Sequence, residues 1–167
     1  ALAVSAEIGP FYVSENGVLN VRNFGENPTL KPVDLPAGTQ RFSLTRKTMA
    51  PMATNRAASL WILPNNLRLV EFHSKANALT ADSMAIVKQA AEDHGAGILI
   101  HNDAQHFSAG VDLNRFADFI ARKAWGEMDT FLNDFQQAVT ALKYTPVPVV
   151  GAPSGLSLGG GFEVLLH

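Results

Sequence analysis

Apolar and polar positions are distributed differently on the two sides of residue 58. Before that point no apolar periodicity persists for more than a few residues, and prolines recur at Pro10, Pro28, Pro32, Pro36 and Pro51. After it, short apolar runs alternate with stretches whose apolar residues recur at helical spacing. The pattern predicts a Pro-rich linker, or the tail of a preceding domain, over residues 1–58, and an α/β domain over residues 59–167.

One piece of the first segment has a pattern typical of ordered structure. In "FYVSENGVLNVRNF", two short runs with strand-forming residues flank Glu15-Asn16-Gly17. Asn-Gly is the preferred pair for a type I′ turn, whose twist matches that of the strands it joins. The stretch therefore predicts a small β-hairpin within the linker.

The first strands of the second segment are indicated by β-branched, aromatic and leucine residues. "SLWIL" and "LRLVEFHS" are separated only by Pro64-Asn65-Asn66, which is typical of a tight turn. They predict an antiparallel pair. Thr80 then has the character of a helix N-cap, with Asp82 in the first turn, and the helix is expected to end near Gly95.

Two further apolar runs predict buried strands of a parallel sheet. "GILIH" at 97–101 is bounded by Gly and Asn, and "PVPVVGAP" follows later in the chain. Helical patterns over roughly 113–123 and 127–143 lie between them. The order of strand, helix, strand, helices and strand predicts an α/β architecture.

Composition narrows the class of protein. The chain has 167 residues, of which 47% are hydrophobic and 17% charged, with a net charge of −2 and no cysteine. These values predict one globular core, no nucleic-acid surface, no disulfide and a cytoplasmic location. No apolar run approaches the roughly 18 to 20 residues of a membrane span. The histidines have no metal-ligand spacing, so no metal site is expected.

Two glycine-containing turns follow the two buried strands. "HNDAQHFSAGVDL" comes after 97–101 and "APSGLSLGGGFE" after "PVPVV", so both lie at carboxyl ends of strands and are expected to face each other. A helix beginning near Asp112 leaves the Val111 N–H without an intrahelical partner, and one beginning at Gly160 does the same for its first N–H groups. Two such donors that converge on one point can stabilise an oxyanion.

These stretches resemble a known family. "HFSAGVDL" followed by "PVPVVGAPSGLSLGGGFE" is similar to the paired oxyanion-hole motifs of the crotonase (enoyl-CoA hydratase/isomerase) superfamily, and "VEFHSKANALT" resembles its early strand and coenzyme A loop. The resemblance runs from about Leu60 to His167 and implies the first half of a crotonase-like ββα superhelix.

The resemblance also implies roles for single residues. The N–H groups of Val111 and Gly160 would bind the thioester oxygen, and Glu163 matches the first catalytic carboxylate of hydratases. A first-turn glutamate often only satisfies backbone N–H groups, so this structural alternative for Glu163 stays open. Asn114 departs from the family pattern, which often has a basic residue there. The remaining matches are to the coenzyme A, pantetheine and thioester contacts: Lys75, Ala76, Ala78, Ala109, Gly110, Asp112 and Leu113.

The particular residues of these motifs resemble those of fused bacterial β-oxidation proteins. In those proteins an NAD-dependent 3-hydroxyacyl-CoA dehydrogenase precedes the crotonase domain, so residues 1–58 would be the end of the dehydrogenase part. The resemblance implies an acyl-CoA substrate, no cofactor in this segment, NAD only for the dehydrogenase part, and a homo-oligomeric parent. A second glutamate would lie near position 183, so the chain alone is expected to be inactive. Two alternatives stay open. The enzyme could be an isomerase, hydrolase or decarboxylase of the same fold, or the domain could be a non-catalytic assembly module.

Overall fold

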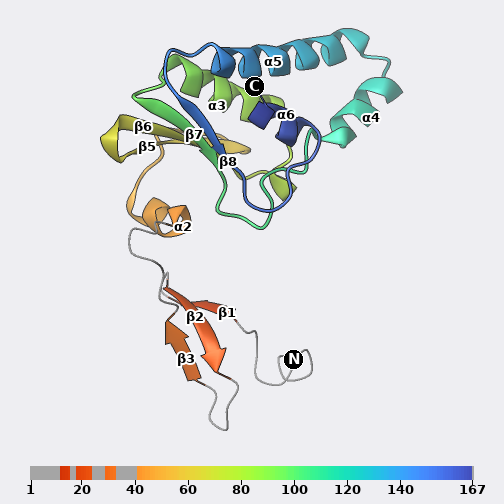
Figure 1. The fold of residues 1–167 in the computed structure, drawn as a ribbon. Helices are drawn as coiled ribbons and strands as arrows, with labels where there is room; N and C mark the ends of the chain where they lie inside the picture. The colour runs from red at the N-terminus through yellow and green to blue at the C-terminus, as the bar shows by residue number, and fades with distance from the viewer. Residues whose placement is uncertain (1–11, 16–17, 24–28, 33–40, 167) are drawn as a thin grey trace. The chain divides into compact units, whose positions relative to one another are not determined.

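The computed structural model describes residues 12–15, 18–23, 29–32 and 41–166. The chain divides into two compact units, Ala1–Thr48 and Met49–His167 (Figure 1). The boundary falls after Thr48, whereas the sequence pattern placed it at residue 58. The reason is that β4 (Ala53–Thr54) pairs with β5 (Ala58–Leu63) and thereby belongs to the larger sheet.

The smaller unit contains an antiparallel sheet in the order β1-β2-β3. Its strands are β1 (Tyr12–Glu15), β2 (Val18–Asn23) and β3 (Thr29–Pro32), followed by the short helices α2 (Phe42–Thr45) and η1 (Arg46–Thr48). The predicted hairpin is confirmed, because Glu15 pairs with Val18; its Asn16-Gly17 turn lies outside the described residues. The Pro-rich linker is not confirmed. Pro32 is compatible with a strand because it ends β3, at the edge of the sheet, where a missing N–H is tolerated.

The larger unit is built on a five-stranded sheet in the order β4-β5-β6-β7-β8. Here β6 is Leu67–Phe72, β7 is Gly97–His101 and β8 is Val149–Ala152. The predicted antiparallel pair is β5 and β6, joined by η2 (Pro64–Asn66), in which Asn65 adopts the left-handed conformation with φ 60°. The strands β6, β7 and β8 are parallel, so their carboxyl ends meet at one edge of the sheet.

The described part of the larger unit also contains helices beyond η2. They are η3 (Lys75–Asn77), α3 (Ala81–Glu92), α4 (Leu113–Ala121), α5 (Trp125–Lys143) and α6 (Gly160–Leu166). Helix α3 packs on β5 and β6, and α5 runs beside α3 (Figure 1). The predicted N-cap is confirmed, since Thr80 Oγ1 accepts from the Ser83 N–H at 3.3 Å. Helix α4 ends two residues earlier than expected, because Lys123 has φ 54°.

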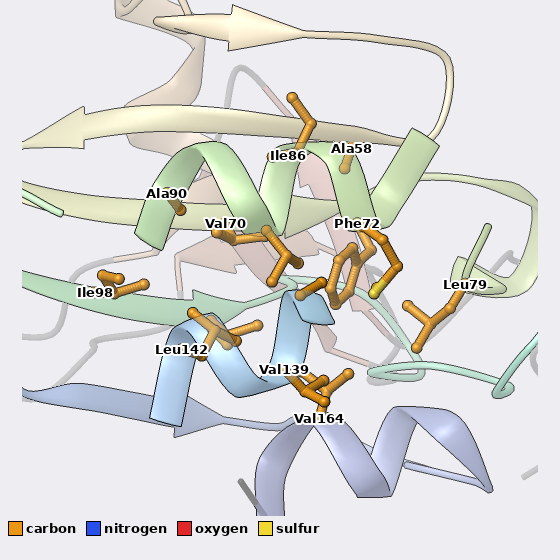
Figure 2. Packing of buried hydrophobic residues seen from close by; sticks show 14 of the residues in the cluster. Ala58, Val70, Phe72, Leu79, Ile86, Ala90, Ile98, Val139, Leu142 and Val164 are labelled. Atoms are coloured by element: carbon orange, nitrogen blue, oxygen red, sulfur yellow. The ribbon is translucent and has the colours of Figure 1, made fainter. Parts of the chain in front are cut away.

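An apolar core joins the sheet to α3, α5 and α6 (Figure 2). It draws on strands, on α3 and α5, and on α6, and its members include Ala58, Leu60, Val70, Phe72, Met84, Val87, Ile100, Val139, Leu142 and Val164. Because α6 contributes Val164 to the same core, the glycine turn that precedes α6 is fixed relative to the sheet.

The prediction that "PVPVV" forms a buried strand is wrong in one respect. The segment does form β8, but β8 is the last strand of the order and Val150 is 55% exposed. An apolar run shows that a strand can be covered on both faces. Its burial also requires neighbouring strands in the sheet and elements packed on those faces. Among the described residues β8 has β7 beside it on one side only.

Candidate active site

The first predicted turn, residues 102–112, is bonded to the loop that contains η3. Leu79 N donates to Gly110 O at 2.8 Å, and Asp112 N donates to Leu79 O at 3.1 Å. These bonds form a parallel bridge between Leu79 and Val111. The bridge is possible because Gly110 has φ +91°, a left-handed conformation that favours glycine.

This bridge sets the direction of the Val111 N–H. In a trans peptide, the carbonyl and the N–H point to opposite sides. Because Gly110 O faces Leu79, the Val111 N–H of the same peptide points away from Leu79. Within the described part of the chain this N–H has no hydrogen-bond acceptor. It is therefore available to a ligand, as the sequence predicted.

The second predicted turn lies beside the first. Phe107 N and Ser108 N both donate to Leu156 O, at 2.9 and 3.2 Å, and Leu158 N donates to Ser108 O at 3.0 Å. Helix α6 then begins at Gly160, which confirms the predicted start. The two glycine turns expected to face each other are thus in direct contact.

The start of α6 directs the Gly160 N–H in a similar way. Gly159 O accepts from Phe162 N at 2.9 Å and from Glu163 N at 3.1 Å, so it points along the helix. The Gly160 N–H, on the other side of that peptide, points out of the helix N-terminus. No acceptor for it exists among the residues that the structure describes.

The two donors are neighbours. A Cβ added to Gly110 would lie 3.5 Å from Gly160 N and 2.8 Å from Leu158 O, and a Cβ added to Gly160 would lie 2.7 Å from Val111 Cγ2. The glycines at 110 and 160 therefore permit a backbone approach that side chains would prevent.

The other predicted residues divide into three groups. Ala76 and Ala109 are bonded to each other, since Ala109 N donates to Ala76 O at 3.1 Å, and Lys75 and Ala78 belong to the same loop as Ala76. Asp112 caps α4 by accepting from Asn114 N at 3.1 Å, and Leu113 is 76% exposed. Glu163 lies in the first turn of α6, with an exposed side chain.

A cavity of about 640 Å³ adjoins the first turn. Of the predicted residues, Lys75 and Asp112 line it, whereas Val111, Gly160 and Glu163 do not. The sequence pattern did not assign the cavity residues from the helices, because they become neighbours only when α3, α4 and α5 pack. They include Thr80, Asp82, Arg115, Phe119, Glu127, Thr130 and Phe131.

Charged side chains at the cavity are largely paired. Arg56 forms an ion pair with Asp82, and Arg122 binds both Asp118 and Glu127, each at 2.9 Å. The Arg122 guanidinium, by its hydrogen bonds, holds the pKa values of the Asp118 and Glu127 carboxyls below their ordinary values. Glu127 therefore stays ionised where it lines the cavity.

The described residues lack two kinds of feature. They contain no group of three His, Cys, Asp or Glu side chains arranged to hold a metal ion. None of the helices found there combines the length and the apolar character that a membrane crossing requires.

Sequence comparison relates the chain to larger proteins. No protein-family model matches it. It is 31% identical over 159 residues to a probable 3-hydroxyacyl-CoA dehydrogenase of Bacillus subtilis, covering 93% of this chain and 20% of that protein. It is 31% identical over 117 residues to a Rickettsia prowazekii protein described as a fatty acid oxidation complex trifunctional enzyme, covering 68% of this chain and 16% of that protein. The chain thus spans a fifth or less of these relatives.

Solved structures with a similar fold include enoyl-CoA hydratases. The hydratase of Polaromonas sp. JS666 matches with a TM-score of 0.60 and 19% identity, over 66% of this chain and 45% of that one. A Hyphomonas neptunium protein of the enoyl-CoA hydratase/isomerase family matches with a TM-score of 0.57 and 25% identity, over 66% of this chain and 44% of that one. The resemblance drawn from the motifs is confirmed at the level of the fold: the chain contains part of a crotonase-fold domain.

Proposed function

We propose that this chain forms part of the acyl-CoA site of a fatty acid β-oxidation enzyme, and that the reaction is hydration of a 2-enoyl-CoA. The proposal is supported by the fold shared with enoyl-CoA hydratases and by the relatives in fatty acid oxidation. It places the thioester oxygen between the N–H groups of Val111 and Gly160.

The observation that carries the proposal is the pair of unpartnered backbone donors at adjoining turns. Adding water to a 2-enoyl thioester develops negative charge on the carbonyl oxygen. Preorganised donors aimed at that oxygen stabilise the charge, and each contributes about 2.7 to 4 kcal/mol to lowering the barrier. If both N–H groups donate to one oxygen at about 2.9 Å, the nitrogens of Val111 and Gly160 must lie within about 6 Å of each other. The close approach of Gly110 to Gly160 N is consistent with such a separation.

Glu163 is the proposed acid or base of the reaction. It follows Gly160 by less than one helical turn and lies on α6, whose N-terminus carries the second donor. A carboxylate at this place on the helix can serve as the base that activates water. The oxidation of the 3-hydroxyacyl product, with NAD, is proposed for the rest of the longer protein and not for this chain.

The test compares the full-length gene product with its Glu163→Gln variant. We expect the wild-type protein to hydrate crotonyl-CoA and the variant to lose at least about 100-fold in kcat, because an amide cannot exchange the proton. The substrate KM should change little, and circular dichroism should be unchanged. The isolated 167-residue chain should show no hydration. A variant as active as the wild type would remove Glu163 from the mechanism, and formation of a 3-enoyl-CoA in place of a hydrated product would favour an isomerase.

A further inference from the structure

Ser108 belongs to the first glycine turn, is bonded to the second, and is fully buried. Its hydroxyl donates to Asn77 O at 2.8 Å and accepts from Gly110 N at 3.1 Å. We infer that Ser108 is a positioning residue for the Val111 donor, acting through Gly110 and without touching the substrate. The inference rests on the proposed function, because it needs Val111 N–H to bind the thioester oxygen.

The first step of the argument is the freedom of Gly110. A glycine has more backbone conformations available than any other residue, so its neighbours must hold it. Here Gly110 N–H is held by Ser108 Oγ and Gly110 O by Leu79 N. With both polar groups of Gly110 fixed, the plane of the next peptide, which carries the Val111 N–H, is fixed as well.

The second step is the anchor of the Ser108 hydroxyl. Its acceptor, Asn77, has a left-handed backbone with φ 51°, and the Asn77 side chain donates to His106 O at 2.8 Å. The loop before Leu79 is therefore tied to residues on both sides of Phe107. The Ser108 hydroxyl donates to the loop before Leu79 and accepts from Gly110, so the position of that loop helps to set the position of Gly110.

The third step is that the side chain and the backbone of Ser108 form hydrogen bonds with different parts of the site. The backbone N–H and C=O of Ser108 bond to Leu156 O and Leu158 N, in the turn that leads to Gly160. Among the described residues, the hydroxyl bonds only to Asn77 and Gly110. Removing the hydroxyl should therefore disturb the Val111 donor and leave the Gly160 donor in place.

The experiment measures the polarisation of a bound thioester carbonyl. Butanoyl-CoA with a ¹³C-labelled carbonyl, which cannot be hydrated, is bound to the full-length protein, and its infrared stretch is compared with that in water. We expect a shift to lower frequency in the wild type and less than about half of that shift in Ser108→Ala. Crotonyl-CoA hydration should lose about 10- to 100-fold in kcat, with KM within about threefold, because one donor is misplaced while the binding contacts remain.

Ser83→Ala is the matched control. Ser83 is also fully buried, and its hydroxyl accepts from Thr80 N at 3.3 Å in the capping box of α3. This variant should lower thermal stability and leave the carbonyl stretch at its wild-type frequency. Should Ser108→Ala fail to fold, Ser108→Cys takes its place, since a thiol fills nearly the same volume but is a weak donor and acceptor.

The possible results separate the inference from the proposed function. A wild-type carbonyl stretch equal to that in water would defeat both. A shifted wild-type stretch that stays unchanged in the Ser108 variant, with kcat also unchanged, would leave the proposed function standing and reduce Ser108 to a structural role.

Discussion

The glycine turns carry the proposed donors, the hairpin formed by α4 and α5 lines the cavity, and the two regions are built differently. In the turns, the groups aimed at the ligand are backbone N–H groups, placed by hydrogen bonds such as that from Leu79 N to Gly110 O. In the hairpin, the contacts are made by side chains. Arg122 binds Asp118 and Glu127. The Phe116 and Phe131 rings pack edge to face, with their centroids 5.5 Å apart.

The difference predicts where substitutions are tolerated. A backbone donor keeps its position only if the chain around it keeps its conformation, so an added Cβ can be enough to move it. An exposed ion pair is screened by water and is worth little, so its side chains can change at small cost. The two regions should therefore respond to mutation on different scales.

The largest effect is expected for Gly160→Pro in the full-length protein. Proline is well accepted at the first position of a helix, so α6 should still form, but the N–H is gone. We expect hydration of crotonyl-CoA to fall at least about 100-fold. Gly160→Ala is the control, because it keeps the N–H while adding a Cβ near Val111. If both variants lose the same activity, crowding and not the missing donor explains the loss.

A smaller effect, on stability, is expected for Gly155→Ala. Gly155 has φ +67°, and a Cβ there would collide with the Gln105 carbonyl oxygen of the other glycine turn. We expect a loss of about 1 to 3 kcal/mol in the free energy of unfolding of the 167-residue chain, measured in urea. Gly126→Ala on α5, where a Cβ would meet nothing within 4 Å, should instead be neutral or stabilising. Equal effects would contradict the contrast between turns and hairpin.

The smallest effect is expected for the ion pairs of the hairpin. The pKa values of Asp118 and Glu127 are lowered in the folded chain, chiefly by hydrogen bonds from Arg122. A lowered folded-state pKa stabilises the fold above the ordinary carboxyl pKa, and this contribution is lost as pH falls through the folded value, below about pH 4. Arg122→Gln should therefore lower the thermal midpoint slightly at pH 7 and by less at pH 3. Lys143→Gln, which also removes one positive charge, should show no such pH dependence.

Local patterns in the sequence predicted the elements well. The run "GILIH", Thr80 as an N-cap and the helix start at Gly160 could each be predicted from a few adjacent residues, because strand propensity, capping and helix initiation depend on near neighbours in the sequence. The fold itself followed from two motifs in the right order. For Gly160 the sequence also predicted an unpaired N–H, since helix starts leave such groups, whereas Val111 precedes the N-cap Asp112 and its N–H is unpaired for another reason.

Tertiary structure decided the features that depend on residues far apart in the chain. The exposure of β8 depends on what lies beside it in the sheet, and the direction of the Val111 N–H depends on a bond from Leu79. The role inferred for Ser108 depends on Asn77, in another loop. A single sequence determines which groups are available for such bonds. Which of them meet is decided only when the strands pair and the helices pack, because these contacts join residues that sequence neighbours do not position.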